Sequence, residues 1–174
     1  MRVEKRKRIL ILTADAGFGH RSAAIAVEAA LKMKYENQAH IDIVNPLNDK
    51  RTPFLLRESQ SDYDKIVRNA PELYKFGYDV SDATVASVMM ETVLTIMFWE
   101  IMRDLLRKYR PDAIFSTYPM YQAPLTAIFS VFRTFVPLLT AITDLATVHR
   151  LWFNAHFDKL LVPNELVSDL GVSY

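Results

Sequence analysis

Residues 8–22 read Arg-Ile-Leu-Ile-Leu-Thr-Ala-Asp-Ala-Gly-Phe-Gly-His-Arg-Ser and carry the clearest signal of the fold. The aliphatic run at residues 9–12 is continuous rather than alternating, which is typical of a strand buried on both faces of a parallel sheet. A glycine-containing turn follows, and apolar residues then recur at helical spacing over residues 20–34. The stretch therefore predicts a strand, a turn and a helix, with this strand the first and most central of the sheet.

The rest of the chain repeats this alternation. Residues 40–44 alternate in polarity and end at Asn45-Pro46, which predicts a second strand and a right-handed crossover from the first. Further strands are predicted at residues 111–116, 137–142 and 158–162, with helices at 121–133 and after Pro163, and a helix stop at Gly171. Residues 53–109 are helical in pattern and form an extra insertion of two or three helices, interrupted near Ala70-Pro71 and Gly77. The predicted fold class is α/β, an open, mostly parallel Rossmann-like sheet with helices on both faces.

Composition narrows the possible functions. A chain of 174 residues with 51% hydrophobic residues fits one folded domain over residues 1–174. The formal charge of +1 lacks the basic excess of a nucleic-acid-binding protein, so no nucleic acid partner is expected. The absence of cysteine excludes thiolate metal sites and a cysteine nucleophile, and the four histidines lack metal-ligand spacing. We expect neither a metal nor a cofactor.

The apolar segment 85–102 raises the question of a membrane. It contains Glu91 and Glu100, and a spanning helix needs about 20 mostly uncharged residues, so we do not interpret it as transmembrane. Two interpretations stay open: a helix buried in the core, or a helix whose exposed end inserts into a lipid interface. In the second case Phe54, Leu55 and Leu56 are the expected membrane contacts. The basic residues at positions 2–8 form either a solvated terminus that aids solubility or a group attracted to an anionic membrane surface.

The first strand's loop contains the strongest candidate for chemistry. In sheets of this class ligands bind beyond the carboxyl ends of the strands. Glycines in this loop permit close approach of a ligand, and the N–H groups of the next helix attract an anion. His20 stands at that helix start, which keeps an imidazole neutral as a general base near pH 7 requires. The alternative is that His20 only caps the helix or packs on the sheet.

Polar residues also follow the third and fourth strands. Asp144 could orient an imidazole, accept a hydrogen bond from a hydroxylated ligand, or cap the following turn. His149 could bind phosphate when protonated or act as an acid or base, whereas Trp152 suits the core or a sugar ring. The glycines match neither the dinucleotide fingerprint nor the phosphate loop of nucleotide triphosphatases, because Ser22 replaces the third small residue and no Gly-Lys-Ser/Thr follows. We expect His20, Asp144 and His149 to converge on one crevice.

Several ordered motifs then carry a resemblance to a known family. Gly17-Phe-Gly-His-Arg-Ser-Ala-Ala24 is similar to the Gly-x-Gly-His-x-x-Ala-Ala opening of the monogalactosyldiacylglycerol synthase and processive diacylglycerol glucosyltransferase family. The similarity continues through Ala70-Pro-Glu-Leu-Tyr74, Pro111-Asp-Ala-Ile-Phe-Ser-Thr-Tyr-Pro119, Thr143-Asp144 with His149 and Trp152, and Val162-Pro-Asn-Glu165. The resemblance implies a two-domain GT-B fold, inversion at the sugar carbon, a UDP-sugar donor and a diacylglycerol-type acceptor. It also implies a peripheral location on the cytoplasmic face of a membrane.

The resemblance assigns roles to parts of the chain. Residues 1–174 would be the Rossmann-like N-terminal acceptor-binding half, without the C-terminal nucleotide-sugar domain, and inactive alone. The catalytic residues would be His20 and Asp144. The acceptor or anion would be bound by Gly17, Phe18, Gly19, Arg21, Ser22, Thr117, Tyr118, Thr143, His149 and Trp152. The alternative function is a non-catalytic module that binds a nucleotide, an anionic lipid or a partner protein. An oxidoreductase with a nicotinamide or flavin cofactor is not expected.

Overall fold

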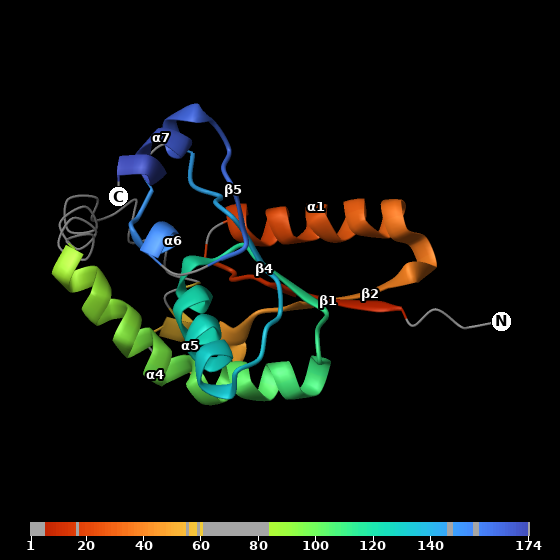
Figure 1. Ribbon diagram of the computed structural model, residues 1–174, viewed down its shortest axis with the longest axis horizontal. Coiled ribbons are helices and arrows are strands. Elements are labelled where there is room, and N and C mark those ends of the chain that lie inside the picture. The colour runs from red at the N-terminus through yellow and green to blue at the C-terminus, as the bar shows by residue number, and fades with distance from the viewer. Residues whose placement is uncertain are drawn as a thin grey trace.

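The computed structural model describes residues 6–16, 18–54, 56–58, 60, 84–145, 148–154 and 157–173. Within these ranges the strands are β1 (Lys7–Leu12), β2 (Ala39–Val44), β3 (Ala113–Ser116), β4 (Leu138–Ala141) and β5 (Lys159–Leu161) (Figure 1). The helices are α1 (Phe18–Tyr35), α4 (Thr84–Tyr109), α5 (Gln122–Phe132), α6 (Leu151–Asn154) and α7 (Glu165–Ser173). Short 3₁₀ turns occur at Glu36–Gln38, Pro46–Asn48 and Pro119–Tyr121. The predicted strands and the helices that alternate with them are confirmed.

The strands form one parallel sheet in the order β2-β1-β3-β4-β5. The predicted α/β class is confirmed, but the position of the first strand is not, because β3 and not β1 occupies the centre. The chain leaves β2 at one edge, crosses back over β1 and adds β3 on the other side of β1. Each later strand then extends the sheet further in that direction, so β1 ends up second from the edge.

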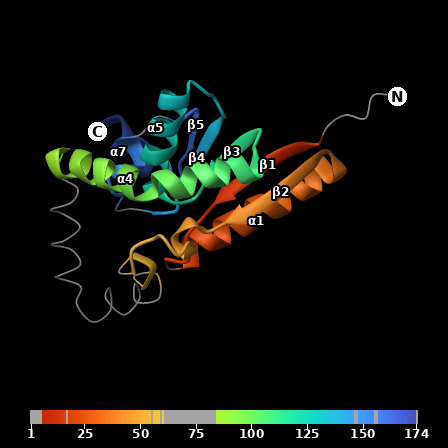
Figure 2. The same ribbon diagram turned by 90° about the horizontal axis from the view of Figure 1, so that it is seen from below.

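Helices cover both faces of the sheet, as predicted (Figure 2). The side chains of β1 divide between the two layers: Ile11 packs with Ala24 on the side of α1, whereas Leu10 and Leu12 belong to the cluster that includes Phe98 of α4. The continuous aliphatic run of β1 is thus explained by burial on both faces.

The helical insertion after β2 is confirmed in α4, and its two halves differ. Phe98, Ile101 and Met102 in the second half are buried in the main core. The first half exposes an apolar stripe made of Val88, Met89, Val93 and Ile96. Among the described residues, no helix is both long enough and apolar enough to span a bilayer. The predicted breaks near Ala70-Pro71 and Gly77, and the motif at residues 70–74, lie outside the described residues.

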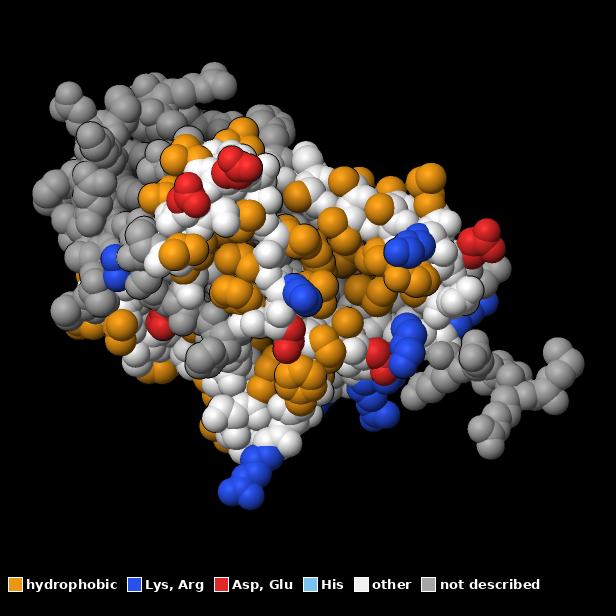
Figure 3. Space-filling model, turned by 45° about the horizontal axis from the view of Figure 1, so that its top comes forward, with side chains coloured by type: hydrophobic (Ala, Val, Ile, Leu, Met, Phe, Trp, Pro, Cys, Tyr) orange, Lys and Arg blue, Asp and Glu red, His pale blue; other side chains and the backbone are white. Residues whose placement is uncertain are grey.

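A groove of about 520 Å³ runs between α1 and the neighbouring face of the sheet. Hydrophobic side chains gather in the hollow on this face, with lysine and arginine side chains around it (Figure 3). Its apolar walls are Ile9, Val27, Leu31, Phe115 and Leu139, and its polar groups include Lys7 and Asp112 near the starts of β1 and β3. The groove therefore extends toward the amino ends of the strands, away from the edge where ligands of such sheets bind.

Gly171 does not end a helix as the sequence predicts, because it lies inside α7. A Cβ atom at this position would lie 2.6 Å from Cε1 of Phe153, a rigid ring carbon. The glycine therefore permits the close approach of α7 to the aromatic ring.

We expect Gly171→Ala to lower the free energy of unfolding by about 1–3 kcal/mol, because the added methyl group overpacks this contact. Urea unfolding monitored by circular dichroism measures the change. Gly19→Ala is the matched control: its Cβ would lie 3.7 Å from Cβ of Thr143, an ordinary contact, so stability should hold or rise. Equal stability losses in the two variants would contradict this explanation of Gly171.

Candidate active site

The carboxyl ends of β1, β3 and β4 bring three threonines to the first turn of α1. Thr13, Thr117 and Thr143 follow these strands directly or within two residues, and His20 is the third residue of α1. The Thr117 side chain is fully buried, and its hydroxyl lies 3.0 Å from Oγ1 of Thr13 and 3.0 Å from the backbone oxygen of His20. This hydroxyl is therefore used within the fold. Thr117 thus supports the start of α1, and its predicted role in binding the acceptor stays a prediction.

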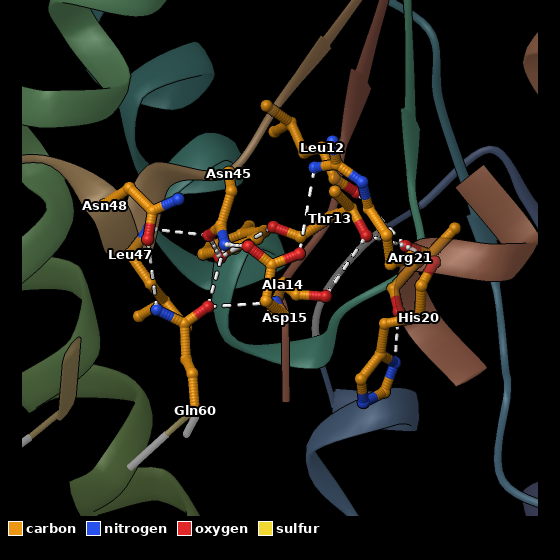
Figure 4. A network of polar contacts seen from close by, with 12 residues as sticks. Leu12, Thr13, Ala14, Asp15, His20, Arg21, Asn45, Leu47, Asn48 and Gln60 are labelled. Carbon is orange, nitrogen blue, oxygen red and sulfur yellow. Dashed lines mark hydrogen bonds and ion pairs between the residues drawn. The ribbon is translucent and has the colours of Figure 1, made fainter. Parts of the chain in front are cut away.

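The contacts of the His20 ring define its tautomer. Nδ1 lies 2.7 Å from the carbonyl oxygen of Thr117 and 2.7 Å from Oγ1 of Thr143. Because a carbonyl oxygen can only accept, Nδ1 carries the hydrogen and donates it to Thr117. In the neutral ring Nε2 then holds a lone pair, and no described residue forms a hydrogen bond with it. Figure 4 shows this second nitrogen pointing away from the polar network around the first loop.

Burial lowers the pKa of His20 below its ordinary value near 6.5. The negative charge of Asp144 and the hydrogen bond to the Thr117 carbonyl act in the opposite direction and offset part of this effect. The sequence predicts a neutral ring on the basis of the helix N-terminus, whereas desolvation is the main cause in the structure. At neutral pH the ring is an uncharged base with Nε2 as its basic atom.

The rings of Tyr118 and Trp152 lie beside this imidazole, and Trp152 also binds Asp144. The Trp152 side chain is 1% exposed, and its Nε1–H donates to Oδ2 of Asp144 over 2.7 Å. The Trp152 ring centroid lies 6.2 Å from that of His20, and the Tyr118 ring meets the imidazole edge-on at 4.9 Å. Trp152 is predicted as a sugar-stacking or core residue. Its burial places it in the core, and its indole N–H is bonded to Asp144, whereas its predicted role in binding the acceptor stays a prediction.

The remaining predicted residues are distributed differently. His149 lies at the start of α6, where its Nδ1 accepts a hydrogen bond from the Leu151 N–H over 3.1 Å. The charge of Asp144 acts on the His20 ring, and the convergence of these two residues with His149 on one crevice stays a prediction. Arg21 and Ser22 are exposed, and Arg21 lies 3.7 Å from Oδ1 of Asp15. Gly17 and the side chain of Phe18 lie outside the described residues, as does Leu55.

A second polar cluster lies beside the loop after β1, and sequence analysis does not single it out (Figure 4). The Asp15 N–H donates to Oε1 of Gln60 over 2.9 Å. Nδ2 of Asn45 donates to Oδ2 of Asp15 over 2.9 Å and to Oε1 of Gln60 over 2.7 Å. Asp15 and Asn45 follow β1 and β2, so the rule that ligands bind at strand ends could have found them. Gln60 belongs to the insertion and does not follow a strand, so no sequence rule points to it.

Within the described ranges, no group of three or more His, Asp or Glu side chains is arranged to hold a metal ion. The chemistry that the described residues themselves can perform is proton transfer at Nε2 of His20, with Asp144 available to stabilise the protonated ring.

The lowered pKa of His20 makes stability depend on pH. Above about pH 6.5 the ring is neutral in both the folded and the unfolded chain, so it has no effect. As the pH falls below that value, the unfolded chain takes up the proton first, and the free energy of unfolding decreases. We expect the wild type to lose more stability than His20→Asn between pH 7.5 and 5.5, as measured by urea unfolding at several pH values. Parallel pH profiles would show that His20 is not responsible.

Known proteins resemble this chain over most of its length. The family model "Monogalactosyldiacylglycerol (MGDG) synthase" matches residues 20–171, a range that begins at His20. The chain is 28% identical over 167 residues to the monogalactosyldiacylglycerol synthase of Spinacia oleracea, which covers 95% of this chain and 32% of the relative. It is 29% identical over 168 residues to monogalactosyldiacylglycerol synthase 1 of Arabidopsis thaliana, a match that covers 95% of this chain and 31% of the relative. A probable monogalactosyldiacylglycerol synthase of Glycine max is 30% identical over 163 residues, a match that covers 92% of this chain and 30% of the relative.

All three plant relatives are named as chloroplastic, and the chain spans about a third of their length. The family model covers most of the 174 residues and includes His20, Asp144 and Trp152. The chain therefore belongs to the monogalactosyldiacylglycerol synthase family.

Proposed function

We propose that this chain is the acceptor-binding half of an inverting GT-B glycosyltransferase that moves a hexose from a UDP-sugar to diacylglycerol. The observation that carries the proposal is the His20 ring, with Nδ1 bonded to Thr117, a lowered pKa and a lone pair on Nε2. The names of the family's plant members specify galactose as the sugar, which favours UDP-galactose as the donor. A second domain outside residues 1–174 would bind most of the donor.

The proposed reaction is a single displacement. Nε2 of His20 takes the proton from the acceptor hydroxyl while the oxygen of that hydroxyl attacks the anomeric carbon of the sugar. The bond between that carbon and the diphosphate oxygen breaks, so UDP leaves and the configuration inverts. Asp144 stabilises the imidazolium that forms, as a buried acid next to a catalytic histidine does in other enzymes. No step requires a metal ion.

The groups around His20 suggest where the acceptor and donor bind. Thr143 and Tyr118 line the imidazole, so we assign them to the acceptor's polar end. The start of α1, with Phe18, Gly19, Arg21 and Ser22, would attract the diphosphate or an anionic lipid headgroup through its N–H groups, and Gly17, which precedes Phe18 in the sequence, is proposed for the same role. His149 and Trp152 would act on the site indirectly, by holding α6 and Asp144.

We also propose that the exposed apolar stripe of α4 and Phe54 contact the membrane that supplies the acceptor. Phe54 is 68% exposed, and the guanidinium of Arg57 lies 5.9 Å from its ring centroid, an apolar group beside a cation that suits an anionic interface. Leu56 is half-buried and packs against the main core, and its predicted membrane contact stays a prediction. The protein would then be peripheral to the membrane.

Membrane contact is tested by flotation with vesicles that contain diacylglycerol and an anionic lipid. We expect the double variant Met89→Ser/Ile96→Ser to lower the bound fraction about tenfold or more, because both side chains lose their apolar contact with lipid. Met33→Ser is the matched control, since Met33 is 83% exposed on α1, across the sheet from α4. Equal binding by both variants, or no flotation of the wild type at low salt, would contradict this surface.

The chemistry is tested in a polypeptide that joins this chain to a nucleotide-sugar-binding domain of the family. Transfer of labelled galactose from UDP-galactose to diacylglycerol in vesicles is the expected activity, and the 174-residue chain alone should show none. Binding of nucleotide or lipid by the joined protein without any transfer would favour a non-catalytic module instead.

A further inference from the structure

Among the described residues of the helical segment after Thr52, the buried side chain of Gln60 contacts the loop after β1. Phe54, residues 56–58 and Gln60 are helical, and Gln60 is only 9% exposed. Its Oε1 accepts from the Asp15 N–H over 2.9 Å and from Nδ2 of Asn45 over 2.7 Å. Its Nε2 lies 3.3 Å from Oδ1 of Asn48 and 3.3 Å from the carbonyl oxygen of Arg57. Both ends of the amide are thus in use.

These bonds continue from Asp15 and Asn45 toward the catalytic histidine. Oδ1 of Asn45 accepts from the Leu47 N–H over 3.0 Å and lies 3.4 Å from the hydroxyl of Tyr121, which donates to the Thr13 carbonyl over 3.1 Å. Thr13 in turn contacts Thr117, whose carbonyl accepts from Nδ1 of His20. Buried polar groups linked in this way fix one conformation, because breaking any member leaves its partner unsatisfied.

We infer that Gln60 is a positioning residue for the active site: through Asp15 and Asn45 it holds residues 13–16, the loop that leads into α1 and His20. The effect of Gln60 on catalysis rests on the proposed role of His20 as the base. The same short helical segment carries the exposed Phe54, so Gln60 ties the proposed membrane contact to the active-site loop.

The test uses the 174-residue chain and does not depend on sugar transfer. Gln60→Met keeps the length of the side chain and removes all four amide contacts, whereas Gln60→Glu keeps the oxygen that accepts from Asp15 and Asn45. Hydrogen exchange at the Asp15 amide is compared with exchange at the Ile114 amide, which donates to the Pro137 carbonyl in the sheet and reports global unfolding. NMR titration of His20 provides the second readout, with Asp144 unchanged in every variant.

We expect Gln60→Met to speed exchange at Asp15 about tenfold relative to Ile114, because a local opening now costs less. We also expect the pKa of His20 to rise toward its ordinary value, since a looser loop lets water reach the ring. Gln60→Glu should restore slow exchange at Asp15. Asn48→Ala removes one acceptor of the Gln60 amide and should produce smaller changes of the same kind. It is the variant to use if Gln60→Met does not fold.

Unchanged relative exchange at Asp15 in Gln60→Met, or an unchanged His20 titration, would overturn the inference. Either result would leave the proposed base intact, because sugar transfer is measured separately. Faster exchange at Asp15 in Gln60→Met, together with full sugar transfer by a His20 variant, would exclude His20 as the base. The role of Gln60 in holding the loop would still stand.

Discussion

Replacing His20 with asparagine should abolish most sugar transfer while leaving the fold intact. The asparagine amide nitrogen occupies nearly the position of Nδ1, so it can still donate to the Thr117 carbonyl that now accepts from His20. The variant lacks an equivalent of Nε2 and therefore has no base for the acceptor hydroxyl. We expect kcat to fall about 10²–10⁴-fold, the usual contribution of a positioned general base, with little change in the KM for diacylglycerol.

The measurement is galactose transfer by the joined two-domain protein described for the proposed function. His40→Asn is the matched control, because His40 is an exposed residue of β2 and contacts Asp42 rather than the active site. A His20→Asn protein with a transfer rate close to that of the wild type would exclude His20 as the base. It would then leave the ring as a binding group for the acceptor or for an anionic headgroup.

Replacing Asp144 with asparagine should cause the second large loss. The asparagine oxygen can still accept from the Trp152 indole N–H, so the local geometry is retained while the negative charge is removed. Without that charge the imidazolium formed during transfer loses its partner, and we expect kcat to fall about 10²–10⁴-fold. The pKa of His20 should also fall further, because Asp144 raises it in the wild type.

The pH profile separates this effect from a general disturbance of the site. In the wild type, activity should fall as the pH drops through the pKa of His20, and Asp144→Asn should shift this acidic limb to lower pH. Trp152→Phe is the companion variant: it removes the N–H donor but keeps the charge of Asp144, so a smaller loss of kcat is expected. An acidic limb that stays in place in Asp144→Asn would show that the two side chains do not interact during catalysis.

Residues near in the sequence account for most of what could be predicted. The aliphatic run of β1, the helical spacing of α1 and the alternation of β2 depend on local periodicity, and the structure confirms each. The end of β1 and the start of α1 also place His20 at the sheet edge where ligands bind. The burial of Thr117 and Trp152 could not be predicted in this way, because a threonine or tryptophan beside a strand end suits a ligand as well as a core.

The amino-acid sequence by itself determined the α/β class, the order of the elements, the family and the choice of His20 as the central residue. Only the tertiary structure decided which nitrogen of that ring carries the hydrogen, since the two partners of Nδ1 come from residues 97 and 123 positions away in the chain. It also decided that Trp152 holds Asp144 and that Gln60 holds the first loop. The physical reason is that periodicity is set by neighbours along the chain, whereas hydrogen-bond partners and burial depend on how the strands and helices pack in space.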